Sequence, residues 1–301
     1  MIKSQITLKQ LEALVAVVDL GSFRKAAALL GTTQPNISNR IAGLEESLGT
    51  ILMHRDAGSV RLSEKGKTLV AAARKVLWEA EALLEAANRQ DLIEDRMRLG
   101  VTELVACTWL HPFLRRFRSV YPAVSVELEV GLSSEIEKKL ATGQLDLALQ
   151  TGPFEHETDG ALPLGTYPYI WAATPEIAAK LGPTTCLATL VKTPIQVHAR
   201  HSLAARALAK QAETQKLAMD QIVYSNSLGA SLQMAIDGMG VSLLPAALLA
   251  EALAAGRLVA LAVDWHPNPL EFFARYSKAK APRFVDQAAR FAVETAQAHL
   301  G

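Results

Sequence analysis

The first 48 residues carry apolar positions at the 3.6-residue period of amphipathic helices. Segment 8–20 has apolar residues three and four apart and predicts a first helix. Two shorter helices follow. Ser22 can cap the first and Gly31 is placed to end it, while Thr33 can cap the second. The second helix has one apolar stripe, formed by Ile37, Ile41, Leu44 and Leu48.

The face of this second helix opposite the stripe is small and rich in amide and hydroxyl groups. Its members are Gln34, Pro35, Asn36, Ser38, Asn39 and Ala42. Such a face is slim enough to reach base edges, and Asn and Gln present paired donors and acceptors to adenine. The pattern predicts a helix-turn-helix whose second helix enters a DNA groove. From these residues alone, an ordinary helical hairpin is the alternative.

Residues 48–66 predict a two-stranded wing, because short apolar segments at 51–54 and 60–62 flank Asp56-Ala57-Gly58. Basic side chains gather in or beside it: Arg55, Arg61, Lys65 and Lys67. Over residues 1–75, eleven Lys and Arg stand against six Asp and Glu, a net charge of +5, whereas the whole chain is +1. A basic module on an otherwise slightly acidic chain indicates contact with nucleic acid.

Residues 63–90 predict one long helix with a heptad seam. The seam residues are Leu69, Ala73, Val76, Ala80, Leu83 and Ala87, with Val70, Leu77 and Leu84 on its flank. A seam with no neighbouring helix in the sequence favours pairing with a second copy of the chain. Two recognition helices held one DNA turn apart, about 34 Å, would read a two-fold symmetric site. Packing of the helix on its own domain is the alternative.

From residue 96 onward, short apolar strands alternate with helices. The expected strands are 98–101, 124–131, 145–152, 167–174, 194–199, 221–226, 240–245 and 270–276, and the expected helices are 109–120, 133–144, one after His201, 227–238 and 283–299. This order predicts parallel sheets in two α/β lobes, with the C-terminal segment completing the first lobe.

Ligands of such sheets bind where strands end and helices begin. The candidate ligand-binding residues at these turns are Thr102, Glu103, Leu132, Ser133, Gln150, Thr151, His198, His201, Ser225, Asn226 and Ser227. Helix N-termini there would present N–H groups to an anion. Simple capping is the alternative for Ser133 and Ser227, and a structural histidine is the alternative for His198. A carboxylate at Glu103 would disfavour a plain carboxylate ligand nearby and favour one with an amine or hydroxyl group.

Composition narrows the class of protein to which the chain can belong. The chain has 301 residues, half of them apolar and a fifth charged, which is ordinary for a globular protein of two or three domains. Cys107 and Cys186 lack metal spacing and are too few for a disulfide framework, so we expect a reducing, cytoplasmic location. Two small buried side chains are the favoured interpretation of these cysteines, and a redox-switch pair is the alternative. No apolar run approaches the length of a membrane span. We therefore expect no metal, no cofactor and no membrane.

The chain resembles LysR-type transcriptional regulators over essentially its whole length. The resemblance is carried by SFRKAAALLGTTQPNISNRIAGLEESLGTILMHR, RLSEKGKTLV, YPAVSVELEVG, LATGQLDLAL and MAIDGMGVSLLP. It implies an N-terminal winged helix-turn-helix domain (1–62), a dimerising linker helix (63–92) and an effector domain (93–301). That domain would resemble a periplasmic binding protein, with lobe one at 93–163 plus 268–301 and lobe two at 164–267.

The resemblance also implies roles for residues and partners. DNA-contacting positions fall on Thr33, Gln34, Pro35, Asn36, Ser38, Asn39, Arg40, Arg55 and Arg61. The implied partners are double-stranded promoter DNA, RNA polymerase, a small effector such as an organic anion or amino-acid-like compound, and further copies of the chain in a dimer of dimers. Two positions depart from the family pattern: Met53 replaces an aromatic, and Asn39 replaces a basic residue.

Together these features favour a regulator in which an effector between the lobes shifts the population of DNA-bound arrangements. A solute-binding protein with an N-terminal dimerisation module is the second hypothesis. The third, an α/β enzyme with a regulatory domain, lacks a GxSxG motif, a phosphate-binding glycine loop and an evident nucleophile–base pair.

Overall fold

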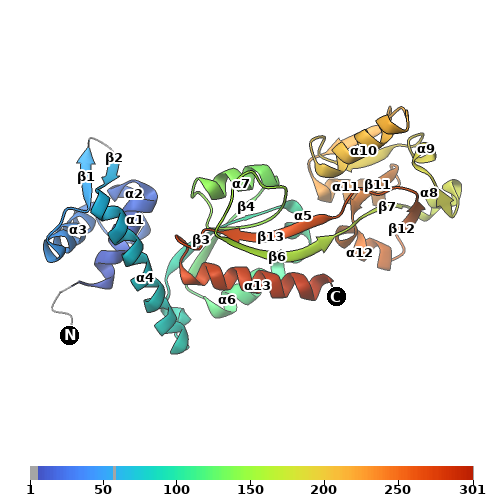
Figure 1. Ribbon diagram of the computed structural model, residues 1–301. Coiled ribbons are helices and arrows are strands. Elements are labelled where there is room, and N and C mark those ends of the chain that lie inside the picture. The colour runs from blue at the N-terminus through green and yellow to red at the C-terminus, as the bar shows by residue number, and fades with distance from the viewer. Residues whose placement is uncertain (1–5, 57–58, 301) are drawn as a thin grey trace. The chain divides into compact units, whose positions relative to one another are not determined.

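The computed structural model describes residues 6–56 and 59–300. The chain divides into two compact units, of which the first holds the N-terminal part through Arg96 together with 118–125 and 277–288. The second holds 97–117, 126–276 and 289–301. Figure 1 labels the elements of both units.

Three helices form the core of the first unit: α1 (Leu8–Leu20), α2 (Phe23–Leu29) and α3 (Gln34–Leu48). Each begins at a hydroxyl side chain that accepts a backbone hydrogen bond from its first turn. These N-caps are Thr7, Ser22 and Thr33. The apolar stripe of α3 is buried as predicted, with Ile37, Ile41 and Leu44 fully covered and only Leu48 exposed at the end. The stripe packs against α1, which leaves the polar face of α3 outward.

The wing consists of the antiparallel strands β1 (Met53–Asp56) and β2 (Ser59–Leu62), followed by the long helix α4 (Glu64–Ala86). The Ser63 hydroxyl caps α4 by accepting a hydrogen bond from the Gly66 amide at 2.9 Å. A side chain at Gly66 would lie 2.0 Å from the carbonyl oxygen of Leu52, so only glycine allows this close approach. Helix α4 is therefore fixed directly onto the wing.

Helix α4 presents two faces to different surroundings. The first part of the heptad seam is covered by the unit's own core, where Val70 and Ala73 are buried. The later seam residues Val76 and Leu83 are 48% and 70% exposed. Packing of the helix on its own domain thus applies to the first part of the seam, and the later part is left exposed.

The opposite face of α4 contacts residues 277–288. Arg74 forms an ion pair with Asp19 and also donates a hydrogen bond to the Lys280 carbonyl at 2.9 Å. Further along, the Arg283 guanidinium lies over the Trp78 ring and donates to Glu85 at 2.6 Å. After α4, the short helix η1 (Gln90–Leu92) leads into the first lobe.

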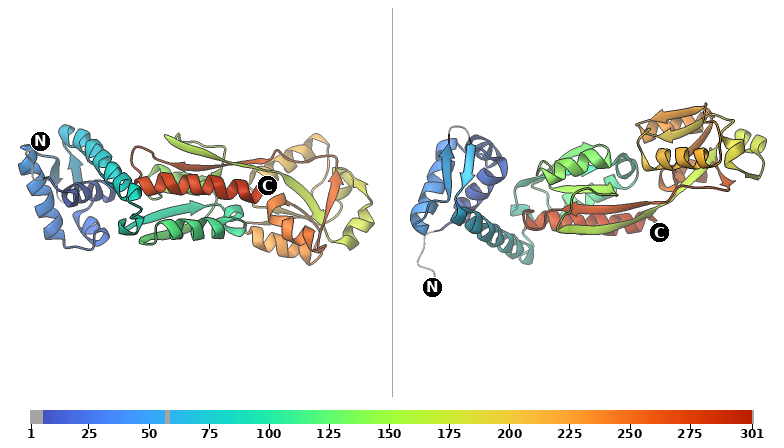
Figure 2. Two further views of the ribbon diagram at one scale, coloured as in Figure 1. Left: turned by 90° about the horizontal axis from the view of Figure 1, so that it is seen from below. Right: turned by 45° about the horizontal axis from the view of Figure 1, so that its top comes forward.

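The first lobe contains a five-stranded sheet in the order β4-β3-β5-β13-β6. Its strands are β3 (Asp95–Val101), β4 (Val124–Val130), β5 (Leu147–Thr151), β6 (Gly160–Tyr167) and β13 (Leu270–Tyr276), and its helices are α5 (Glu103–Cys107), α6 (Leu110–Val120), α7 (Ser133–Ala141) and α13 (Arg283–Leu300). Helix α7 covers one face of the sheet and α13 runs along the other (Figure 2).

The second lobe contains a six-stranded sheet in the order β10-β9-β11-β7-β12-β8. Its strands are β7 (Tyr169–Ala173), β8 (Thr184–Thr185), β9 (Ile195–His198), β10 (Ile222–Ser225), β11 (Val241–Pro245) and β12 (Val259–Val263), and its helices are α8 (Pro175–Leu181), α9 (Leu187–Leu190), α10 (Leu203–Thr214), α11 (Leu228–Ile236) and α12 (Ala246–Ala254).

Both sheets are mixed, which corrects the expectation of parallel sheets. In the first, β3 and β5 are parallel, but β13 is antiparallel to β5 and β6; in the second, β7 is antiparallel to β11 and β12. The chain passes between the lobes twice, from β6 to β7 and from β12 to β13. The strands next to these two passages are the ones that form antiparallel pairs. The first crossing lies at Pro168, so β6 extends the first lobe to Tyr167, beyond the expected limit at 163. The expected helix 109–120 is confirmed as α6, and a short helix that was not expected, α5, precedes it.

Candidate DNA interface and effector site

The predicted recognition face lies on α3 and is open to solvent. Gln34, Pro35, Asn36 and Asn39 are exposed, and Ser38 is half-buried beside them. The N-cap Thr33 accepts a hydrogen bond from the Asn36 amide at 3.4 Å, and the Asn36 side chain donates to Thr32 Oγ1 at 3.1 Å. The first turn of α3 is thereby held rigid, which aims the amides that follow it.

The basic residues near the wing divide into two groups. Arg61 and Lys65 are exposed, whereas Lys67 forms an ion pair with Glu64 at 2.7 Å. Arg40 is half-buried on α3. Arg55 lies in β1 opposite Val60, and its side chain is outside the described part of the structure. Two of the eleven basic side chains of residues 1–75, Lys67 and Arg74, are therefore paired with acidic residues of the same segment.

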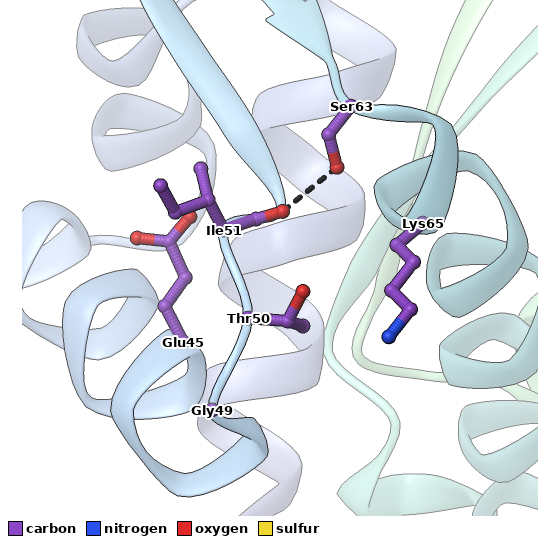
Figure 3. A pocket seen from close by; sticks show the side chains of 6 residues that line it. All are labelled: Glu45, Gly49, Thr50, Ile51, Ser63 and Lys65. Atoms are coloured by element: carbon purple, nitrogen blue, oxygen red, sulfur yellow. Dashed lines mark hydrogen bonds between the residues drawn. The ribbon is translucent and has the colours of Figure 1, made fainter.

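A hollow of about 560 Å³ lies where α3, the wing and α4 meet (Figure 3). Glu45 accepts a hydrogen bond from the Leu52 amide at 2.7 Å, and the Ser63 hydroxyl donates to the Ile51 carbonyl at 2.7 Å. These bonds fix the wing to the end of α3 and the beginning of α4. The hollow lies between the elements that these bonds connect, and none of the predicted ligand-binding residues lines it.

In the first lobe, the predicted ligand-binding residues meet at the carboxyl ends of β3 and β5. Thr102 is next to β5 because its amide donates to the Leu149 carbonyl at 3.1 Å. Gln150 is fully buried, and within the described residues neither of its side-chain amide atoms has a partner. The buried Thr102 hydroxyl likewise has none among them. Unpaired buried polar groups cost about 1–3 kcal/mol each, and those of Thr102 and Gln150 are free to hydrogen-bond a water molecule or a ligand.

Ser133 does not cap α7, contrary to the capping alternative. The N-cap position is Leu132, and the Ser133 hydroxyl instead accepts a hydrogen bond from the Thr151 amide at 3.2 Å. This bond ties the start of α7 to the end of β5. Ser133 and Thr151 are therefore brought to the same edge of the sheet as Gln150.

In the second lobe, His198 and Ser225 are register partners on β9 and β10. Ser227 caps α11 as predicted, and its amide donates to Ser225 Oγ at 3.1 Å. Burial lowers the pKa of His198 below its ordinary value, against an opposing effect of the nearby Glu103 carboxylate. Burial therefore favours the neutral form of the imidazole.

Glu103 connects the two groups, although it begins α5 in the first lobe. Its carboxylate accepts hydrogen bonds from Ser227 Oγ at 3.0 Å, the Leu228 amide at 2.7 Å and the Gly229 amide at 3.2 Å. Glu103, which follows Thr102 in the first lobe, is thus bonded directly to Ser227 of the second lobe, and its charge also acts on His198. The side chains of Leu132, His201 and Asn226 are exposed.

Sequence reasoning missed Gln196, a buried residue of β9 two positions before His198. The carboxamide of Gln196 has no hydrogen-bond partner within residues 6–56 and 59–300. Because strand side chains alternate, Gln196 and His198 share one face of the sheet. A polar residue inside the apolar segment PIQVHA was the signal that could have identified it.

The remaining chemistry is sparse. Cys107 is exposed and Cys186 half-buried, and both are free thiols. Within the described ranges, His, Cys, Asp and Glu side chains form no group of three able to hold a metal ion. A search of the same residues for a helix long and apolar enough to cross a membrane finds none.

Two family descriptions match the chain. Residues 8–67 match the "Bacterial regulatory helix-turn-helix protein, lysR family", and residues 90–297 match the "LysR substrate binding domain". A probable hydrogen peroxide-inducible genes activator of Streptomyces viridosporus is 32% identical over 262 residues, which cover 85% of this chain and 83% of that protein. The chain belongs to the LysR family, and it is a DNA-binding transcriptional regulator with an effector-binding domain.

Solved structures share the fold. A Corynebacterium glutamicum OxyR C206 mutant is 20% identical with a TM-score of 0.58, over 98% of this chain and 94% of its own. Full-length LysG of the same organism, solved with bound effector Arg, is 21% identical with a TM-score of 0.54, over 96% and 98%. Both resemble this chain from the N-terminal helix-turn-helix through the two-lobed domain.

Proposed function

We propose that α3 reads DNA through Gln34, Pro35, Ser38 and Asn39, with Thr33, Asn36 and Arg40 beside them and Arg55 and Arg61 of the wing on phosphates. The proposal is supported by the exposed amides on a helix whose other face is buried and whose first turn is rigid. Amides placed this way can pair with adenine in the major groove, and exposed wing cations suit phosphates.

Gln34→Ala/Ser38→Ala should lower affinity for a specific duplex at least about 30-fold, because each of the two base contacts contributes about 1–3 kcal/mol of discrimination. Affinity for random duplex should stay unchanged, since the phosphate contacts remain. Fluorescence anisotropy at fixed salt measures both affinities, on a site first selected from a random pool with the wild-type protein.

Ser47→Ala is the matched control, because Ser47 lies at the far end of α3 and its hydroxyl donates only to the Gly43 carbonyl. It should bind the specific duplex like the wild type. Full specific affinity in the Gln34/Ser38 variant would refute the proposed readout by these two residues.

We also propose that the exposed half of the α4 seam pairs with a second copy of the chain. Val76 and Leu83 are exposed, while the opposite face of the helix is covered by Arg74–Lys280 and Arg283–Glu85 contacts within the unit. An apolar seam left open beside an occupied polar face suits a helix–helix dimer. It would hold two recognition helices on a two-fold symmetric site.

Leu83→Glu should raise the dimer dissociation constant at least tenfold, because burying a leucine side chain contributes about 1.5–3 kcal/mol. Ala71→Glu, at an exposed position of α4 outside the seam, is the control and should leave the dimer intact. Sedimentation velocity over a concentration series measures both variants. Unchanged dissociation of Leu83→Glu would contradict the proposed pairing.

The effector, in this proposal, binds between the lobes at Thr102, Glu103, Ser133, Gln150, Thr151, His198, Ser225 and Ser227. The unpaired buried groups of Thr102 and Gln150 support a polar ligand, an organic anion or an amino-acid-like compound. Ligand binding would shift the population of lobe arrangements and, through a dimer of dimers, access of RNA polymerase to the promoter. In this proposal the protein binds the effector without catalysing a reaction. We place it in the cytoplasm, where the promoter DNA is.

We propose the same domain limits as those expected from the sequence: the DNA-binding domain is 1–62, the linker helix is 63–92 and the effector domain is 93–301. We place the lobe boundary at Pro168, since β6 belongs to the first sheet and β7 to the second.

A further inference from the structure

Glu103 is a carboxylate placed where a helix N-terminus binds anions. Leu228 and Gly229 are the first two residues after the N-cap of α11, so their amides lack partners within the helix. Both donate to Glu103, at 2.7 and 3.2 Å, and the third amide, of Ala230, donates to Ser227 Oγ at 3.2 Å. The orphan donors at the start of α11 are therefore all used.

The charge of Glu103 has little other compensation. Within the part of the chain that the structure describes, no Lys or Arg forms an ion pair with Glu103, and burial lowers the pKa of the nearby His198, which favours its neutral form. The positive end of the α11 dipole and the Ser227 hydroxyl are the groups that stabilise it. The carboxylate thus occupies the position that an anionic ligand would take.

We infer that Glu103 is a tethered anion that fills the N-terminus of α11 and excludes negatively charged groups of the effector from that position. The inference rests on the proposed effector site. It refines the ligand class, because the effector must turn a neutral or cationic group toward α11. A carboxylate has about four acceptor positions and three are used, which leaves one for an N–H or O–H donor of the ligand. Glu103 is therefore a specificity-determining residue.

Chemical rescue tests this assignment. Glu103→Ala removes the CH2–COO⁻ portion of the side chain, which acetate can replace. We expect the variant to melt about 2–6 °C below wild type and to regain that loss in about 0.1 M acetate, while equal ionic strength of chloride restores less than half of it. Wild type and Glu213→Gln, an exposed glutamate on α10, should not respond to acetate.

A second variant keeps the test decisive if Glu103→Ala does not fold. Glu103→Gln keeps the side-chain volume but loses the charge. Because the carboxamide fills the position, this variant should not bind acetate. The NMR chemical shifts of the Leu228 and Gly229 amide protons should move upfield, because their acceptor is no longer charged. Unchanged shifts in Glu103→Gln, equal acetate responses of wild type and Glu103→Ala, or no selective acetate rescue would each overturn the inference. These measurements use no DNA, so their failure is distinct from failure of the α3 variants.

Discussion

Arg275→Met should lower the free energy of unfolding of the second unit by about 3–5 kcal/mol, the usual cost of breaking a buried ion pair on one side. Arg275 and Glu137 are 3% and 5% exposed, and Arg275 Nη1 lies 3.3 Å from Glu137 Oε1. The guanidinium also stacks on the Phe154 ring at 3.8 Å and donates to the His156 carbonyl. Methionine fills the space but leaves the Glu137 carboxylate buried without its cation.

Urea denaturation monitored by circular dichroism measures this loss. Arg257→Met is the control, because the Arg257–Glu251 pair at 3.5 Å is largely exposed and should contribute less than about 1 kcal/mol. Adding Glu137→Gln to Arg275→Met should recover part of the stability, since it removes the unpaired charge. A loss below about 1 kcal/mol in Arg275→Met would show that the backbone amides of Glu155 and His156 suffice for the carboxylate.

The ion pair also matters for the effector site. Glu137 of α7 accepts hydrogen bonds at 2.8 Å from the Glu155 and His156 amides, in the loop that follows Gln150 and Thr151. The pair therefore holds the exit of β5 against α7. Neither the partners nor their burial could be read from the sequence, because they lie 138 residues apart.

The N-terminal helices and the lobe strands were predictable because their apolar periods are local. The structure confirms the stripe of Ile37, Ile41 and Leu44 and the cap at Ser227. Strand β6 was missed because Pro163 and Gly165 are unfavourable in strands. Both are accommodated at an edge strand, where the register with Phe272 and Phe273 shifts by one residue.

Helix α12 and strand β12 were missed for another reason. The alanine-rich run from 246 to 262 gives no contrast between apolar and polar positions, so its period is hidden. The turn at Gly256, with φ of 67°, separates the helix from the strand. Similarly, the turn position of Glu103 was predictable, but its contact with Ser227, 124 residues away, depends on how the two lobes meet.

The first unit should become less stable as the pH rises from about 4.5 to 7, because Glu81 is buried against α13. Burial raises the pKa of Glu81 to about 7, opposed by hydrogen bonds from the Phe284 and Arg283 amides and assisted by the charges of Asp95 and Glu85. In the unfolded chain this carboxyl ionises near 4.5. Between these values the folded state holds the proton more tightly, so stability falls with rising pH and levels off above 7.

Glu81→Gln keeps an acceptor for the two amides but cannot ionise. It should therefore stabilise the unit by about 3 kcal/mol at pH 8, the free-energy equivalent of the pKa shift, and by little at pH 4.5. Urea denaturation at pH 4.5–8.5 measures the difference between variant and wild type. Glu79→Gln, an exposed residue of the same helix, is the control and should give a flat difference near zero.

A flat or negative difference for Glu81→Gln across this range would contradict the prediction and would mean that the carboxylate is ionised and held by the amides of Arg283 and Phe284.

Glu81 lies where α4 contacts the start of α13, so its protonation state bears on function. Glu81 and Glu85 hold the start of α13, and Glu85 also accepts a hydrogen bond from Tyr121 at 2.8 Å. Arg283 and Phe284 lie within the region that matches the substrate-binding domain, whereas α4 continues directly from the wing. A proton on Glu81 would therefore strengthen the connection through which the effector domain is joined to the DNA-binding helices.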